Sequence, residues 1–266
     1  MGEGSYGVAI KASCEGRPYA VKALIDREDQ TRGELLFHLE SEILKGIAHP
    51  RVPGFVESFS AGNINCIVQD FLDGMPLSSL LDAGRRFSER EVKSLMAQLL
   101  SILNSLHSPP RREEAVVHRD LRLSNLLLKD DQLFLIDFGF ARYLDPSRNL
   151  SCPDPLEQKY SGSPGGKSLL RRLNDQPSRK KRIPGAETYR LLRTEISPRS
   201  DLFGAGVVAV DLFTSWVEDE ALFERPWHEV LSLSPPFAGF LTRLLSRQDG
   251  FETAAEALEY LRTLSY

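Results

Sequence analysis

The first seventy or so residues alternate between strand-like and helical patterns of apolar and polar positions. Tyr19–Leu24 and Asn65–Gln69 are short apolar runs, which predict two strands. Between them, Leu35–Ile47 carries apolar residues at helical spacing. His49-Pro50 then ends the helix, because proline disfavours a helical conformation in the residue before it. The pattern therefore predicts strands around one helix up to about residue 69.

Beyond Asp73-Gly74 the pattern becomes mainly helical. Ser88-Glu89-Arg90-Glu91 has the spacing of a capping box, which predicts a helix start. An apolar stripe follows at helical spacing, and we interpret it as core packing: Val92, Leu95, Met96, Leu99, Leu103 and Leu106. Leu126–Leu128 and Leu133–Ile136 predict two short strands around the turn Lys129-Asp130-Asp131. Helical periodicity returns at Asp201 and continues to the C-terminus.

Residues 145 to about 185 differ from the rest of the chain in composition. Pro, Ser, Gly, Lys and Arg dominate, and nine Lys or Arg against four Asp or Glu leave about +5. Such a segment buries too little apolar surface to offset the entropy lost on ordering. We predict a disordered basic insert here.

Composition and charge exclude some functional classes for this chain. The 266 residues suit one large domain or two lobes, and a formal charge of -4 argues against nucleic-acid binding by the whole surface. Phe203–Trp216 is too short for a membrane span and contains Asp211, so we interpret it as a core helix. Cys14, Cys66 and Cys152 lack metal-ligand spacing and favour a reducing compartment. We expect a cytoplasmic protein without membrane association.

One stretch of the C-terminal half carries an ordered set of chemical groups. His118-Arg119-Asp120-Leu121 is followed by Asn125, five residues after the Asp, and by Asp137-Phe138-Gly139 twelve residues later. One acid that can accept a proton thus precedes two groups that can hold a metal. That order is what phosphoryl transfer from Mg-ATP to a hydroxyl requires.

The N-terminal region offers a phosphate-binding loop and a lysine. Gly2-Glu3-Gly4-Ser5-Tyr6-Gly7 matches G-x-G-x-x-G, a weak signal alone, in which bare backbone can approach phosphates. Lys22 follows Gly7 by fifteen residues in a predicted strand, from which it can pair with phosphates. Glu40 on the predicted helix is the natural partner of Lys22. Glu34 and Glu42 compete for that role, and the spacing to His49-Pro50 favours Glu40.

With this ordered set, the chain resembles the eukaryotic-type protein kinase family over nearly its whole length. The resemblance implies an α+β bilobal fold, with a small β-rich N-lobe around one main helix and a larger, mainly helical C-lobe. It further implies a single kinase domain over 1–266, with the N-lobe at 1–69, the hinge at 70–74 and the C-lobe at 75–266. The basic insert then lies in the activation segment.

The resemblance also implies a role for each matching residue. Asp120 is the expected catalytic base, Arg122 a γ-phosphate contact in place of the usual lysine, and Lys22–Glu40 the activating ion pair. Asn125 and Asp137 are the expected Mg2+ ligands. The ATP-binding set comprises Gly2, Gly4, Gly7, Ala9, Ala20, Lys22, the gatekeeper Gln69, Asp70, Leu72 and Leu127. The remaining matches are Asp201, which would hold the catalytic-loop backbone, and the hydrophobic regulatory column of Leu44, His118 and Phe138, for which packing is an equal explanation.

Four departures from the family pattern concern the edges of the site. The sequence begins at the glycine loop without the usual first half-strand, so either the start is truncated or the protein begins upstream. Ala9 replaces a valine over the adenine, which costs at most about tenfold in affinity. The Ala-Pro-Glu that closes the activation segment is not recognisable near Leu191–Arg193 or Glu195, nor is its arginine partner, although Arg247 lies nearby. Gly139 and Asp201 stand 62 residues apart, more than the family needs. The prediction that these departures weaken most is the one about substrate specificity, because the catalytic set itself is intact.

We therefore expect an ATP- and Mg2+-dependent protein kinase that acts on Ser or Thr hydroxyls and can autophosphorylate. Poor matching of the peptide-docking segment keeps a small-molecule phosphotransferase as an alternative. A pseudokinase scaffold is a further alternative, against which the complete set of polar groups argues.

Two regulatory hypotheses concern the activation segment. Arg119 would receive a phosphate from one of Ser161, Ser163, Ser168, Ser178 and Thr188. The run Arg179–Arg182 would be a solvated charge run or a docking patch for an acidic partner. Nucleic acid is not expected there, since no aromatic side chains interleave with the charges.

Overall fold

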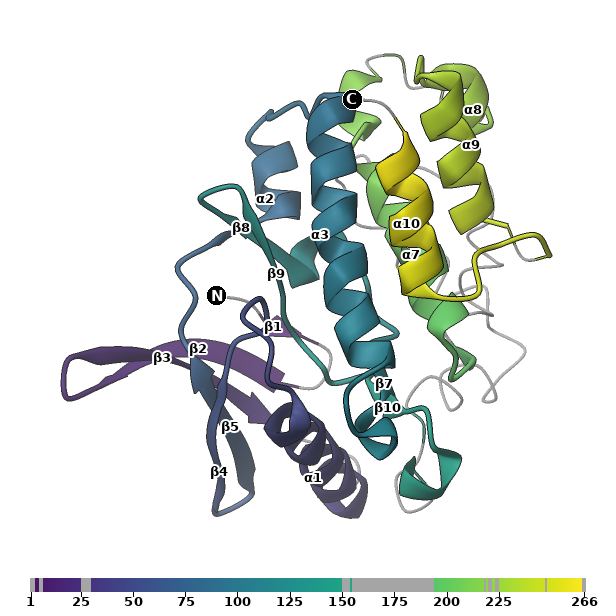
Figure 1. Ribbon diagram of the computed structural model, residues 1–266. Helices are drawn as coiled ribbons and strands as arrows, with labels where there is room; N and C mark the ends of the chain where they lie inside the picture. Colours follow the sequence, from purple (N-terminus) through teal and green to yellow (C-terminus); the bar gives the residue numbers. More distant parts are fainter. Residues whose placement is uncertain are drawn as a thin grey trace, which may run out of the picture.

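The structure is a computed structural model that describes residues 3–4, 7–24, 30–149, 154, 194–217, 219, 222, 225–246 and 248–264. Figure 1 shows a β-rich N-terminal part with one long helix, and a larger part built mainly of helices. The expected bilobal arrangement is therefore present.

The N-terminal part is a five-stranded antiparallel sheet with the strand order β1-β2-β3-β5-β4. Its strands are β1 (Glu3–Gly4), β2 (Gly7–Cys14), β3 (Arg17–Leu24), β4 (Phe55–Ala61) and β5 (Ile64–Asp70). The turn between β2 and β3 uses Glu15 and Gly16, both with positive φ, as a tight two-residue hairpin requires. Both expected strands, around Lys22 and around Val68, are confirmed.

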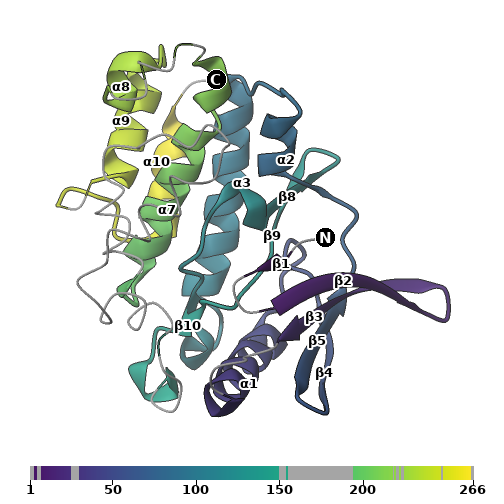
Figure 2. The same cartoon turned by 180° about the vertical axis from the view of Figure 1, so that it is seen from behind.

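Helix α1 (Gln30–Gly46) packs against β4 and β5. Its buried residues include Phe37, Leu39, Ile43 and Leu44, which repeat at helical spacing. The helix begins five residues before the predicted start, because its first turn is polar and gives no apolar signal. The two views in Figures 1 and 2 place α1 beside the sheet.

The chain then enters the helical part through β6 (Met75–Pro76), α2 (Leu77–Asp82) and α3 (Glu89–His107). Ser88 caps α3: its hydroxyl accepts from the Glu91 backbone N–H, and the Glu91 carboxylate accepts from the Ser88 backbone N–H. The predicted capping box is therefore confirmed. The apolar stripe of α3 is buried in the core, as expected.

Short elements carry the polar motif between α3 and the last helices. They are η1 (Arg112–Glu114), β7 (Val116–Val117), η2 (Leu123–Asn125), β8 (Leu126–Lys129), β9 (Gln132–Leu135), β10 (Arg142–Tyr143) and η3 (Pro146–Asn149). β8 and β9 form the predicted hairpin, and Asp130 and Asp131 at its turn both have positive φ. β7 pairs with β10, so the strand just before His118 lies beside the segment that follows Gly139.

The C-terminal helices complete the helical part. They are α7 (Pro198–Asp211), η4 (Thr214–Trp216), α8 (Trp227–Val230), α9 (Pro235–Leu244) and α10 (Ala254–Thr263). α7 and α10 both pack on α3. The expected core helix over 203–216 ends at Asp211, and Trp216 is 53% exposed.

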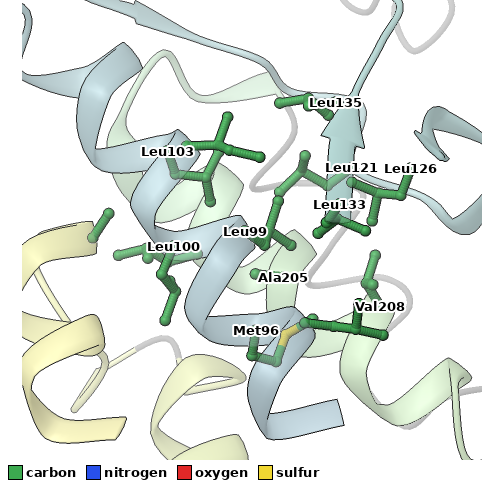
Figure 3. Packing of buried hydrophobic residues seen from close by; sticks show 14 of the residues in the cluster. Met96, Leu99, Leu100, Leu103, Leu121, Leu126, Leu133, Leu135, Ala205 and Val208 are labelled. Atoms are coloured by element: carbon green, nitrogen blue, oxygen red, sulfur yellow. The ribbon is translucent and has the colours of Figure 1, made fainter. Parts of the chain in front are cut away.

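One core joins α3, α7 and the β8–β9 hairpin. Figure 3 shows buried side chains gathered between them: Met96, Leu99, Leu100, Leu103, Leu121, Leu126, Leu133, Leu135, Ala205 and Val208. This core anchors the polar motif, because Leu121 directly follows Asp120 and Leu126 directly follows Asn125.

Several expectations concern residues that the structure does not describe. Gly2, Cys152, Arg247, most of the basic insert including Arg179–Arg182, and Leu191–Arg193 lie outside the described residues. Residues 146–149, at the start of that insert by composition, form η3. Among the described residues, no helix is long and apolar enough to span a membrane. The cytoplasmic location stays a prediction.

Candidate active site

Lys22 lies in the middle of β3, opposite Ala9 of β2 and Ile67 of β5. Its Nζ donates to Glu40 Oε1 at 2.7 Å and to Asp137 Oδ1 at 2.7 Å. The strand, the long helix and the Asp-Phe-Gly segment thus meet at one ammonium group. Of the three glutamates considered on α1, Glu40 makes the contact, whereas the exposed Glu42 pairs with Lys45 at 3.0 Å.

The charges of this cluster stabilise one another. Burial alone would lower the pKa of Lys22, but the carboxylates of Asp137 and Glu40 raise it well above its ordinary value. The charge of Lys22 holds the pKa of Asp137 well below its usual range, although burial opposes this. Burial raises the pKa of Glu40, and Lys22 limits that rise. Lys22 and Asp137 are therefore ionised at neutral pH.

Gly139 leaves little room for a side chain beside the ion pair. A Cβ atom at this position would lie 3.0 Å from Lys22 Nζ, 3.4 Å from Asp137 Oδ1 and 3.5 Å from Glu40 Oε2. Because the closest of these contacts is tighter than ordinary van der Waals contact, a side chain here would push on the ion pair. This explains the glycine of the Asp-Phe-Gly motif in physical terms.

Asp120 and Asn125 lie together in the loop between β7 and β8. The Asn125 Nδ2 group donates to Asp120 Oδ2 at 2.9 Å and to the Asp120 carbonyl at 3.0 Å. Arg122 Nε lies 3.2 Å from Asp120 Oδ2, and its side chain is 56% exposed. The Asn125 carbonyl accepts from the Ile136 N–H at 3.0 Å, so this loop is joined to the residue before Asp137.

A buried carboxylate fixes the backbone just before Asp120. Asp201 accepts from the His118 N–H at 2.8 Å and from the Arg119 N–H at 2.7 Å, and it also contacts His107 Nε2 at 2.9 Å. Burial would raise the pKa of Asp201, but these hydrogen bonds and the neighbouring histidines hold it below its ordinary value. The expected contact of Asp201 with the loop backbone is present. His107 is an additional partner that the sequence did not indicate.

Two residues of the site adopt a left-handed backbone. Arg119 has φ 65° and Asp137 has φ 67°. Such conformations cost on the order of 1–3 kcal/mol each in non-glycine residues, and they persist where the surroundings hold them. The Asp201 carboxylate supplies that support at Arg119, and the Lys22 ammonium does so at Asp137.

His118 connects the loop with Phe138. Its Nδ1 accepts from the Asp120 N–H at 3.2 Å, and its Nε2 faces the Ile136 carbonyl at 3.1 Å. The tautomer with the proton on Nε2 satisfies both contacts. Its ring packs edge-on against Phe138 at 4.8 Å. Leu44, the third residue of the expected column, is buried in the same core.

The predicted nucleotide-binding residues are spread over the sheet and β8. Gly4 and Gly7 face each other in the β1–β2 hairpin, and Ala20 pairs with Gln69 across β3 and β5. Leu127 lies on β8 opposite Pro76, and its Cβ is 3.2 Å from the place of a Cβ on Gly74. Gly74, at the end of the predicted hinge, therefore lies close to β8.

Other side chains engage two of the predicted hinge groups. Gln69 Nε2 donates to the Pro53 carbonyl at 3.1 Å, and Asp70 Oδ1 accepts from Arg17 at 2.6 Å. Both partners of the Asp70 pair are largely exposed. Leu72 is half-buried, and Ala9 is exposed, with Val8 beside it 37% exposed.

Arg119 makes a contact that sequence reasoning missed. Its guanidinium donates to Asp154 Oδ2 at 2.7 Å and to the Thr194 carbonyl at 3.3 Å. No periodicity or motif indicates this pair, because 35 residues separate its members. The five hydroxyl residues proposed as phosphate acceptors, 161, 163, 168, 178 and 188, lie outside the described residues.

The site offers oxygen atoms of the kind that magnesium takes. Asn125 and Asp137 supply an amide and a carboxylate oxygen, and Mg2+ commonly uses one or two carboxylates with phosphate oxygens and water. Nowhere in the described residues do three or more His, Cys, Asp or Glu side chains gather as a metal site. The arrangement thus fits a metal that arrives with a phosphate ligand.

Comparison with known proteins finds similarity to protein kinases. A family model described as the protein kinase domain matches residues 1–164. A probable serine/threonine-protein kinase, YbdM of Bacillus subtilis (strain 168), is 32% identical over 150 residues, which are 55% of this chain and 57% of that protein.

Two other relatives match shorter shares of their own length. The calcium/calmodulin-dependent protein kinase cmkA of Emericella nidulans is 33% identical over 150 residues, 54% of this chain and 34% of that protein. The NUAK family SNF1-like kinase 1 of Mus musculus is 31% identical over 170 residues, 62% of this chain and 24% of that protein. The chain thus spans at most 57% of these relatives. The family model itself ends at residue 164.

Proposed function

Because the chain belongs to the protein kinase domain family, we propose that it transfers the γ-phosphoryl group of ATP to Ser or Thr hydroxyls of protein substrates. The observation that carries the proposal is the contact of Lys22 with both Glu40 and Asp137, at 2.7 Å each. It brings the strand lysine, the helix and the Asp-Phe-Gly segment into one arrangement. The Bacillus subtilis relative is named a probable serine/threonine-protein kinase, which favours Ser or Thr as the acceptor.

Asp120 is the proposed base. Its buried carboxylate is held by Asn125 Nδ2 at 2.9 Å and Arg122 Nε at 3.2 Å. A fixed carboxylate can orient an acceptor hydroxyl and take its proton as the phosphoryl group transfers. Arg122 is exposed enough to meet a phosphate, which supports its proposed γ-phosphate contact.

Lys22 and the glycine hairpin form the proposed phosphate-binding part. A lysine held in a strand by Glu40 presents its charge at a fixed place, where α- and β-phosphates would pair with it. Gly2, Gly4 and Gly7 would bring bare backbone to the phosphates. The adenine would lie among Ala9, Ala20, Gln69, Asp70, Leu72 and Leu127.

Asn125 and Asp137 are the proposed magnesium ligands. A bound Mg2+ would neutralise charge on the β- and γ-phosphate oxygens. Asp137 is ionised at neutral pH, because Lys22 lowers its pKa, so no proton must leave before it binds a cation. Its side chain is 33% exposed, which leaves it accessible.

Replacement of Asp120 tests the proposal. Asp120→Asn keeps the shape of the side chain but removes the proton acceptor, so we expect a loss of about 10²–10⁴-fold in phosphoryl transfer with ATP binding retained. Transfer is measured with labelled ATP and a generic Ser/Thr substrate, and sites are mapped by mass spectrometry. Asp130→Asn is the matched control, because Asp130 is exposed in the β8–β9 turn and asparagine accepts its positive φ. Equal transfer by wild type and Asp120→Asn contradicts the proposal.

A further inference from the structure

The side chain of Arg119 is fully buried, and it faces Asp154. Its relative exposure is 0%, that of Asp154 is 11%, and 2.7 Å separates Arg119 NH2 from Asp154 Oδ2. A guanidinium stays protonated in proteins, so its burial is costly unless a negative charge accompanies it. Asp154 supplies that charge.

The pair bears directly on Asp120 because Arg119 precedes it in the chain. Two carboxylates hold this residue from two sides: Asp201 accepts from its backbone N–H at 2.7 Å, and Asp154 accepts from its guanidinium. The backbone of Arg119 is left-handed, a conformation that its surroundings must maintain. A change at either carboxylate therefore acts on the residue that positions Asp120.

The same guanidinium joins two distant places in the chain. It also donates to the Thr194 carbonyl at 3.3 Å, and 40 positions separate Asp154 from Thr194. The residues at both ends of the segment 155–193 are thus tied to the loop that carries Asp120. A phosphorylated hydroxyl is one way to provide a negative charge to an arginine. Here a carboxylate already lies at that arginine.

We propose that Asp154 is a positioning residue that holds the Asp120 loop through Arg119 without phosphorylation of the chain. The inference rests on the proposed kinase function, and it makes phosphoryl transfer independent of a phosphate in the 155–193 segment. It is an alternative to the hypothesis that a phosphorylated Ser or Thr of this segment pairs with Arg119.

Asp154→Asn is the central variant, with Asp154→Glu as its conservative partner. We expect Asp154→Asn to lower kcat about 10- to 100-fold, because a shifted loop misplaces the base. The KM for ATP should stay within about twofold, since Lys22, which is proposed to bind the phosphates, and its partner Glu40 do not take part in the Arg119–Asp154 pair. Asp154→Glu should recover most of kcat, which a merely structural loss would not explain. Asp82→Asn is the control, because Asp82 is an exposed aspartate at the end of α2.

Treatment with a phosphatase completes the test. Wild-type protein is dephosphorylated, and mass spectrometry verifies that no phosphate remains. In its first turnovers it should transfer phosphate as fast as untreated wild type. A wild type that loses its activity on dephosphorylation overturns the inference, and so does an unchanged kcat in Asp154→Asn. A kcat of Asp154→Glu close to that of wild type, together with a much lower kcat of Asp154→Asn, supports it.

The failure of the proposed function gives a different result. In that case wild type transfers no more phosphate than Asp120→Asn, and the pair is then tested by melting temperature. Asp154→Asn should lower it by about 5–10 °C, and the same substitution should change it little when Arg119→Gln is already present. Additive decreases overturn the inference, whereas strong coupling leaves the pair standing and removes only the kinase assignment.

Discussion

Lys22 is shared by two carboxylates whose surroundings differ. Glu40 has a side chain 5% exposed, whereas that of Asp137 is 33% exposed. Solvent or a cation can therefore reach Asp137 more easily than Glu40. If Asp137 bound the proposed Mg2+, the buried Glu40 would still hold Lys22, so we propose different tasks for the two acids despite their equal 2.7 Å contacts.

This difference predicts the effect of Glu40→Gln. The substitution keeps the size of the side chain but removes the charge that holds Lys22, so kcat/KM for ATP should fall about 10- to 100-fold. Steady-state kinetics at varied ATP measure it. Glu42→Gln is the matched control on the same helix: Glu42 is exposed and pairs with Lys45, so its kcat/KM should stay within about twofold. Equal losses in both variants would refute the assigned role of Glu40.

Helix α3 connects the N-terminal cap at Ser88 with the buried His107 beside Asp201. Ser88→Ala removes the oxygen that accepts from the Glu91 N–H, so the free energy of unfolding should fall by about 1 kcal/mol. Ser94→Ala is the matched control within the helix. Ser94 is exposed there, and alanine has the higher helix propensity, so stability should stay equal or rise slightly. Urea denaturation measures both, and a Ser88→Ala protein as stable as wild type would show that the cap contributes nothing.

At the scale of secondary-structure elements, the sequence predicted the helices and strands that carry a local signal of their own. The stripe and capping box of α3, the strand around Lys22 and the β8–β9 turn each carry a periodicity or turn signal within a few residues. The start of α1 carries no such signal, because its first turn is polar. The strands β7 and β10 carry none either. Those two-residue strands exist only because they pair with each other across 25 positions.

At the scale of the whole molecule, some residues of the site were predictable from the sequence and some contacts between them were not. Lys22, Asp120, Asn125 and Asp137 stood out because a known order of motifs marks them. The pairs Arg119–Asp154 and His107–Asp201 did not, since nothing in the spacing of the chain determines which distant charged groups meet. The roles of the site residues stay predictions until the variants are measured.

Asp201 links α7, α3 and the Asp120 loop, so its ionisation affects the stability of the whole domain. Its pKa is below the ordinary value in the folded protein. The stability that it contributes is therefore complete above the unfolded-state pKa of about 4 and is lost as pH falls through the lower folded-state pKa. Asparagine resembles the protonated acid, which makes Asp201→Asn the informative variant.

At pH 7 we expect Asp201→Asn to lower the free energy of unfolding by about 2–4 kcal/mol. The difference from wild type should shrink progressively below about pH 4, as wild-type Asp201 takes up its proton. Urea denaturation of both proteins between pH 7 and pH 3 measures this. A difference that stays constant, or grows toward pH 3, would contradict the assigned ionisation of Asp201.

Ligand binding should stabilise the domain in a way that depends on the metal. A ligand at one hundred times its Kd adds about 2.7 kcal/mol to stability, which for a chain of this size is roughly 5–10 °C in melting temperature. We expect ATP with Mg2+ to give this rise and ATP with EDTA to give a smaller one, because only the basic side chains of the site then balance the phosphate charge. Asp137→Asn should lose the magnesium-dependent part and Asp130→Asn should keep it, since Asp137 contacts Lys22 in the site whereas Asp130 lies in the β8–β9 turn. An equal rise with and without Mg2+ in the wild-type protein would exclude Asn125 and Asp137 as the magnesium ligands.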